Sequence, residues 1–205
     1  MPDFDVEDRL QHGLRYDEYR DHWKGRLEEA PPSGADPSER RMHYYLNYNW
    51  DRQADVHEAY TPSNDLRTAI DASNQSRYWM VLTEPWCGDS AFLLPVLAEA
   101  ADVSENVTLR ILLRDDNLDI MDQYLTDGSR SIPKLVSFSS DGEERFTWGP
   151  RPEQARERFR ALQDQYEEKS EIIAKLLEYY DDGGWKEADG ELAAAVRSAV
   201  RAPVE

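Results

Sequence analysis

Mostly apolar stretches bounded by turn residues predict four strands in the middle of the chain. The first two lie at 77–83 and 107–113 and have the length and composition of buried strands. Further along, Asp141-Gly142 is a hairpin signal between short strands at 135–138 and 144–148. The pattern therefore predicts two parallel strands followed by a hairpin.

Apolar residues at helical spacing predict helices before, between and after these strands. The first, Val6–Leu27, is interrupted near Gly13, and a proline-rich break at 30–37 follows it. Thr61-Pro62 supplies a cap and a first-turn proline for a helix over 61–72. The other predicted helices span 39–60, 91–100, 118–125, 153–180 and 191–200. This alternation predicts an α/β fold, in which a central mixed sheet carries helices on both faces.

The chain's single cysteine, Cys87, lies where the first predicted strand ends and a helix begins. The first N–H groups of a helix have no intrahelical partner and carry partial positive charge, which stabilises a thiolate and lowers the pKa of the thiol. This position favours a reactive thiol. The alternative is a buried, inert cysteine, because free cysteines often behave as small apolar side chains.

The residues around Cys87 resemble the redox motif of the thioredoxin superfamily. Trp86-Cys87-Gly88 at a strand-to-helix junction, with Pro95 eight residues after the cysteine, is similar to the family's active-site helix. Ile132-Pro133, roughly 45 residues further on, resembles the segment whose proline is cis and lies beside the reactive cysteine. The resemblance covers about Thr61 to Leu177 and implies a thioredoxin-like fold.

This resemblance divides the chain into three regions. A helical N-terminal extension packed on the core spans 1–60, the thioredoxin-like domain spans 61–180, and a C-terminal helical tail spans 181–205. The end of the extension is unusually aromatic. Its aromatic side chains either pack on the core or form a lid or peptide-binding wall over Cys87; they are Tyr44, Tyr45, Tyr48, Trp50 and Tyr60.

Three departures from the family pattern bear on activity. The second cysteine of the motif is replaced by Ser90, so that the stretch is Cys-Gly-Asp-Ser, and internal resolution of a mixed disulfide is unavailable. The family's buried acid falls on Val81, which cannot transfer a proton. Asp89 takes the place of the usual proline, and its negative charge next to sulfur raises the pKa of the thiol.

The resemblance assigns roles to the residues near sulfur. Cys87 is the nucleophile, with Ser90 and Pro133 beside it, while Trp86 and Ile132 shape a groove for substrate. The N–H groups from Gly88 to Ser90 stabilise negative charge on sulfur.

Several of these roles have simpler alternatives. Asp89 either caps the helix or acts in the chemistry, and Ser90 is either an ordinary first-turn residue or a donor to sulfur. Arg130 is a candidate cation for a thiolate or an anionic substrate, or a surface arginine without a partner. Lys134 is a second candidate cation near sulfur.

Composition narrows the class of partner. The 205-residue chain has 24 basic and 42 acidic residues and a net charge of −18, which argues against nucleic acid and anionic membranes as partners. Five lysines and an acidic surface suit a high-salt cytoplasm, where ions screen the repulsion. One cysteine fits a reducing compartment, and neither a secretory signal nor an apolar run of roughly 20 residues is present. A cytoplasmic location follows from these features.

Two functions follow from the sequence. In the first, Cys87 is a lone thiol that exchanges with a disulfide or joins a protein or small thiol in a mixed disulfide, which an external thiol then releases. In the second, the chain is a redox-inactive thioredoxin fold that binds protein partners. No cofactor is expected. The four histidines lack ligand spacing for a metal. The stretch Cys87–Ser90 also loosely resembles the Cys-Gly-x-Ser motif of monothiol glutaredoxins, some of which share an iron–sulfur cluster between two chains. The lysine that those relatives carry a few residues before the cysteine is missing here, where Thr83-Glu84-Pro85-Trp86 stands.

Overall fold

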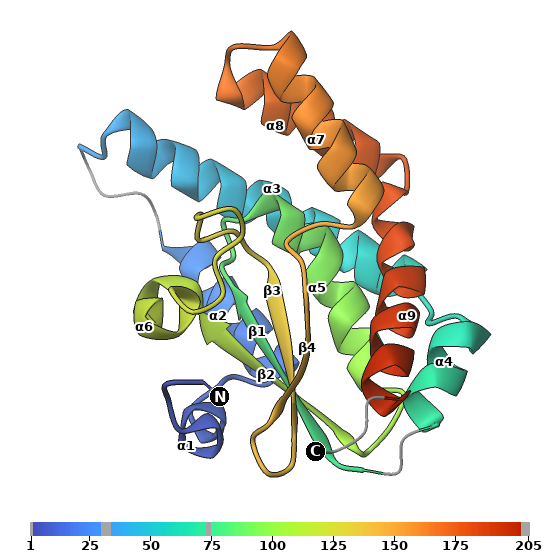
Figure 1. Cartoon of the computed structure of the whole chain (residues 1–205). Helices are drawn as coiled ribbons and strands as arrows, with labels where there is room; N and C mark the ends of the chain where they lie inside the picture. Colours follow the sequence, from blue (N-terminus) through green and yellow to red (C-terminus); the bar gives the residue numbers. More distant parts are fainter. Residues whose placement is uncertain (1, 30–33, 73–74, 202–205) are drawn as a thin grey trace.

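A mixed sheet forms the centre of the molecule (Figure 1). The computed structural model describes residues 2–29, 34–72 and 75–201, and within these ranges the sheet has four strands in the order β2-β1-β3-β4. The strands are β1 (Arg77–Thr83), β2 (Val107–Leu113), β3 (Lys134–Ser139) and β4 (Glu144–Trp148). β2 is parallel to β1, whereas β3 is antiparallel to both β1 and β4. The predicted parallel pair, hairpin and α/β class are confirmed.

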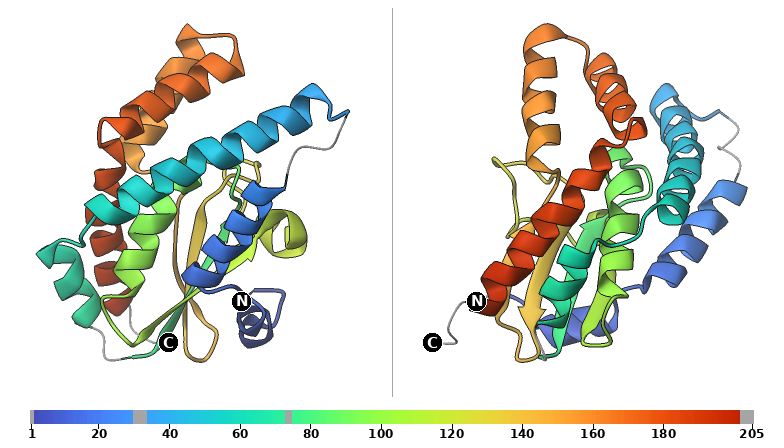
Figure 2. Two further views of the ribbon diagram at one scale, coloured as in Figure 1. Left: turned by 180° about the vertical axis from the view of Figure 1, so that it is seen from behind. Right: turned by 90° about the vertical axis from the view of Figure 1, so that its right-hand side faces the viewer.

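Side chains of the sheet alternate between two cores, as the pleat of a strand requires. On one face, Trp79 and Val81 of β1 join the larger core, which is covered by α2 (Tyr16–Glu28), α3 (Pro37–Ala59) and α5 (Gly88–Ala101), among others. On the other face, Met80 and Leu82 join a smaller core. The helices α1 (Val6–Gln11) and α6 (Leu118–Met121) cover that face (Figures 1 and 2).

The first predicted helix is interrupted where glycine was expected to break it. After α1 the chain passes through Gly13, and Leu14 exchanges two backbone hydrogen bonds of 2.8 Å with Ile111 of β2 before α2 begins. Gly13 is needed at this close crossing, because a Cβ there would lie 3.0 Å from Cβ of Arg110.

Several helix boundaries differ from the sequence predictions; α6, for example, ends at Met121 and not at residue 125. α4 (Asn64–Asp71) begins after Ser63, whose hydroxyl accepts the N–H of Leu66, so the predicted start at Thr61-Pro62 is wrong. The final helix, α9 (Glu187–Arg201), follows the short 3₁₀ turn η2 (Gly184–Lys186) and is longer than predicted, because Ala188, just before the predicted start, is also buried.

The long helix predicted over 153–180 is two helices. α7 (Glu153–Gln165) and α8 (Lys169–Asp181) are separated by Tyr166, whose backbone is extended. The chain reverses there, so that both helices place apolar residues against the core instead of one helix running into solvent; these include Ala155, Leu162, Ile172 and Leu176. The predicted break at 30–37 and the end of the C-terminal tail lie partly outside the described residues.

Two helical arms extend beyond the carboxyl end of β1. One arm is the first half of α3, and the other is the α7–α8 pair (Figure 2). At their base Arg52 of α3 forms an ion pair of 3.1 Å with Asp181 of α8. Among the described helices, none is both long and apolar enough to cross a bilayer.

Candidate functional site

Cys87 lies at the base of the two arms, in the loop that joins β1 to α5. It is the N-cap residue of α5, and its N–H donates to the carbonyl of Glu84 at 3.1 Å. The buried side chain of Asn49 in α3 binds this loop by donating a hydrogen bond to the carbonyl of Pro85 at 3.1 Å. Helix α3 therefore fixes the backbone that presents the cysteine.

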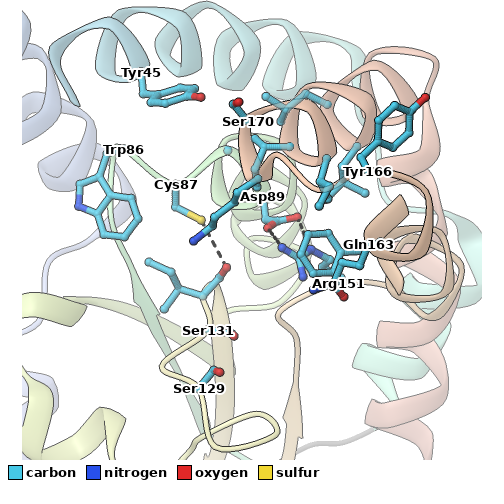
Figure 3. A pocket seen from close by; sticks show the side chains of 18 of the residues that line it. Tyr45, Trp86, Cys87, Asp89, Ser129, Ser131, Arg151, Gln163, Tyr166 and Ser170 are labelled. Carbon is cyan, nitrogen blue, oxygen red and sulfur yellow. Dashed lines mark hydrogen bonds and ion pairs between the residues drawn. The ribbon is translucent and has the colours of Figure 1, made fainter. Parts of the chain in front are cut away.

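The segment with Pro133 lies directly beside the sulfur. The Cys87 Sγ donates to the carbonyl of Ile132 at 3.3 Å, and the Ile132–Pro133 peptide bond is cis (Figure 3). A second cis bond, Gly149–Pro150, lies against this segment. Gly149 has φ of 104°, and a Cβ there would lie 2.3 Å from the Pro133 oxygen, so only glycine fits.

The thiol of Cys87 is buried and neutral. Only 8% of the residue is exposed, and it belongs to the smaller core together with Met80, Leu82 and Ile132. Burial raises the pKa of Cys87 to about 11, and the negative charge of Asp89 adds to this effect. The expectation that the helix N-terminus lowers the pKa is therefore wrong, because burial and Asp89 outweigh the helix.

Asp89 is bound by two residues that the sequence analysis did not place in the site. Arg151, just after the second cis bond, donates to both carboxylate oxygens at 2.8 and 2.7 Å, and the Tyr180 hydroxyl of α8 donates at 3.0 Å. Both side chains of the ion pair are largely buried. Asp89 thus joins α5, the segment after β4 and the α7–α8 arm, and among the described residues its carboxylate accepts hydrogen bonds from these two side chains and from no backbone N–H.

Ser90 lies in the first turn of α5 and is buried. Its hydroxyl and its N–H favour the thiolate form of Cys87, but they only partly offset burial and Asp89. With the thiol neutral, the Ser90 hydroxyl makes no hydrogen bond of standard geometry to the described residues.

The two cations considered for the sulfur are engaged elsewhere. Arg130 forms a two-point ion pair with Asp122 at 2.6 and 2.8 Å, so it is not an unpartnered surface residue. The ammonium of Lys134 donates to the hydroxyl of Thr126 at 2.7 Å and to the carbonyl of Gly149 at 3.4 Å. A third cation, which the sequence analysis missed, lies closer to the motif: the Arg114 guanidinium is 4.7 Å from the ring centre of Trp86.

An open cleft of about 1320 Å³ lies between the two arms, with Cys87 on its floor (Figure 3). Trp86 and Ile132 form the rest of the floor, and Met42 and Tyr45 of α3 line one wall. The apolar residues of the opposite wall come from the α7–α8 arm and include Phe159, Tyr166, Ile173 and Leu177.

The aromatic residues at 44–60 are divided between the core and the cleft. Trp50 packs edge-on against Trp23, and Tyr60 packs against Trp185 with its hydroxyl donating to Asp189. Tyr45 instead lines the cleft, one residue from the exposed Tyr44.

Three of the four acidic residues in η1 (Arg114–Asp116) and in and around α6 are paired with arginines. Asp115 binds Arg114, Asp119 binds Arg9, and Asp122 binds Arg130. Across the described residues, no three His, Cys, Asp or Glu side chains converge on a point that could hold a metal ion.

Comparison with protein families identifies the fold. A sequence model described as thioredoxin matches residues 36–169, about two thirds of the chain. The chain belongs to the thioredoxin superfamily. The match begins in front of α3, earlier than the stretch that resembled the family by motif, and it therefore includes the helix that holds the cysteine loop.

Solved structures with the same fold are distant in sequence. The crystal structure of a protein of unknown function from Pseudomonas aeruginosa is 15% identical, with a TM-score of 0.60 over 96% of this chain and 99% of that chain. An HIV epitope-scaffold is 16% identical, with a TM-score of 0.59 over 94% and 98%. Both show the thioredoxin-like fold alone, and no curated protein sequence matches the chain.

Proposed function

We propose that this thioredoxin-fold protein is a binding module that holds an extended segment of a protein partner in the cleft above Cys87, with the thiol uncharged. The observation that carries the proposal is the state of the sulfur. It donates a hydrogen bond to the Ile132 carbonyl, and the pKa of Cys87 is raised to about 11. A donating, buried thiol is a poor nucleophile, because the thiolate is the reactive form.

The raised pKa of Cys87 supports binding over exchange. With a pKa of about 11, roughly one thiol in ten thousand is ionised at pH 7. The chain has no second cysteine to resolve an adduct, and Val81 is fully buried where the family's proton-transferring acid is expected. Each of the three features slows thiol–disulfide exchange by itself.

The cleft has the composition of a surface that binds polypeptide. Aromatic and aliphatic side chains on its two walls face a floor formed by Trp86 and Ile132. Aromatic residues bury a large area at low entropic cost, and a long open cleft between helical arms accommodates an extended chain.

Exchange through a lone thiol is the second candidate, because the Cys87 side chain lines the cleft and lies at the N-terminus of α5. The ionised sulfur would attack one sulfur of a substrate disulfide and expel the other as a thiolate. The resulting mixed disulfide would then need an external thiol for release. A reducing cytoplasm supplies such thiols.

The first test measures the ionisation of Cys87 directly. The rate of alkylation by iodoacetamide is followed in the folded protein from pH 6 to 11.5, with Cys87→Ser as the blank. We expect the rate to keep rising through pH 10 because the folded pKa is above the ordinary value of about 8.5. A plateau reached by pH 7 would restore the exchange mechanism and remove the binding-only proposal.

The second test separates binding from covalent capture. Partner proteins retained from lysate are compared for the wild type, Cys87→Ser, Tyr45→Ala and the matched control Tyr44→Ala, whose side chain is exposed next to the cleft wall. A binding module retains its partners with Cys87→Ser and with Tyr44→Ala but loses them with Tyr45→Ala. Partners that disappear with Cys87→Ser and elute with dithiothreitol would identify exchange instead.

A further inference from the structure

The cleft gathers positive charge on a protein that is strongly negative. Five of the 24 basic residues of the chain line it, against three of the 42 acidic residues. One of the three acids, Asp89, is already neutralised by Arg151. The cleft therefore has the opposite charge preference to the rest of the surface.

The positive charge lies mainly on one side of the sulfur. Arg114 stacks on Trp86, Arg130 lies in the segment that leads to Ile132, and Arg41 is one helical turn from Tyr45. In Figure 3, Tyr45 lies above Trp86, which places the α3 wall over this end of the floor. The remaining cleft-lining acids are on the opposite arm: Asp164 lies at the end of α7, and Glu167 lies in the turn between α7 and α8.

These arginines have donors to offer a ligand. Arg114 directs Nε and Nη2 to Asp115 and Nη1 to the carbonyl of Arg130, which leaves two of its five N–H groups. Arg41 is exposed and forms no ion pair with any described residue. The ion pair of Arg130 with Asp122 is half exposed, so that exchanging one carboxylate for another costs little.

We propose that the ligand of the cleft is an extended acidic segment of a partner protein, with its carboxylates bound by Arg114, Arg130 and Arg41 beside Trp86. This inference rests on the proposed binding function. A planar guanidinium held against an aromatic ring is well placed for two-point carboxylate binding, and its position is fixed before the ligand arrives. The cleft extends from α3 to the α7–α8 arm, which exceeds the needs of a small acidic compound.

The test uses three fluorescein-labelled nine-residue peptides in which Leu alternates with Glu, Gln or Lys. Fluorescence anisotropy is measured at about 0.15 M salt, where repulsion from the net charge is screened beyond about 8 Å. We expect the Glu peptide to bind at least tenfold more tightly than the Gln peptide, and the Lys peptide not to bind.

Variants assign the preference to the arginines. Arg114→Gln should weaken the Glu peptide roughly five- to tenfold and leave the Gln peptide unchanged, since a hydrogen bond to a charged group is lost. Arg41→Gln, at an exposed position where folding is not at risk, should act in the same direction. Arg145→Gln is the matched control, because Arg145 lies in β4 and does not line the cleft.

The outcomes distinguish a failure of the acidic preference from a failure of the proposed binding function. Equal affinities for the Glu and Gln peptides, both abolished by Tyr45→Ala, would overturn the acidic preference and leave the binding module intact. If glutathione, an acidic tripeptide, competes with the Glu peptide at equal concentration, the ligand is a small acidic compound and the protein-segment assignment is wrong. Failure of every peptide at millimolar concentration would overturn both proposals.

Discussion

Two aspartate–arginine pairs near the cleft have nearly the same geometry and opposite surroundings. Arg151 and Asp89 meet through two hydrogen bonds of 2.8 and 2.7 Å, and Arg130 and Asp122 meet through two of 2.6 and 2.8 Å. The side chains of the first pair are 15% and 9% exposed, whereas those of the second are 46% and 49% exposed. Geometry alone therefore does not say what a pair does.

Burial gives the two pairs different roles. Water competes for the exposed pair and screens it, so it contributes little stability and its arginine remains available to a ligand. The buried pair has lost its hydration, so neither partner tolerates the loss of the other. Burial works against the charge on Arg151, but Asp89 more than compensates, and the pKa of this arginine is raised.

Replacing Arg151 should have the largest effect. Arg151→Gln leaves the Asp89 carboxylate buried without its counter-charge, so we expect a loss of about 3–5 kcal/mol in the free energy of unfolding, measured by urea denaturation. The double variant Arg151→Met with Asp89→Leu should recover most of it, because no charge is left unpaired. A loss below about 1 kcal/mol for the single variant would show that the buried pair contributes no more than an exposed one.

The second largest effect is expected from replacing Asp89, which should lower the pKa of Cys87. Asp89→Asn removes the negative charge that raises the pKa of Cys87 and leaves the Arg151 cation nearby, so the pKa should fall. Each unit of that fall increases the thiolate about tenfold, which the alkylation rate at pH 8 reports. Asp122→Asn is the control and should not alter the rate. An unchanged or slower rate for Asp89→Asn would show that burial alone sets the pKa.

The salt dependence of the free energy of unfolding should also differ between buried and exposed charges. Between 0.1 and 2 M KCl, screening of the −18 net charge should raise the free energy of unfolding by on the order of 1 kcal/mol or more. The cost of Arg151→Gln should stay nearly constant over this range, because the pair is shielded from ions. Stability of the wild type that does not rise with salt would refute the expected adaptation to a high-salt cytoplasm.

The smallest effect is expected for the exposed pair. Arg130→Gln should change the free energy of unfolding by less than about 1 kcal/mol, because water replaces the lost ion pair. The same denaturation series as for Arg151→Gln provides the measurement. A loss of stability comparable with that of Arg151→Gln would show that burial does not determine how much an ion pair contributes to stability here.

The strands and the α/β class could be predicted from the sequence, because they follow from local apolar patterns. The proximity of Cys87 to Ile132-Pro133 was predicted only through the resemblance to the thioredoxin superfamily, since 45 residues separate them. The pKa of Cys87 could not be predicted, because it depends on how deeply the folded chain buries the sulfur and on the charge of Asp89 beside it. The division between α7 and α8 was missed since the apolar stripe continues across Tyr166 without a proline or glycine.

The residues that bind Asp89 could not be predicted from the sequence either. Arg151 and Tyr180 are 62 and 91 residues away along the chain, and neither belongs to a recognisable spacing. If the Asp89 carboxylate is buried, its negative charge must be neutralised, and because the chain has no metal-ligand pattern the neutralising group is expected to be a basic side chain. The sequence contains 24 candidates and no signal that selects one of them.

The backbone bridge between Leu14 and Ile111 affects whether other proteins can add a strand to the edge of the sheet. It occupies the outer side of β2 at its middle, and at the opposite border α9 packs along β4, where the Trp148 indole donates to Glu191. A foreign strand that tries to extend the sheet meets the chain's own N-terminal segment on one flank and a helix on the other. The fold thus discourages edge-to-edge aggregation and leaves the space between the arms as the open route to the centre of the molecule.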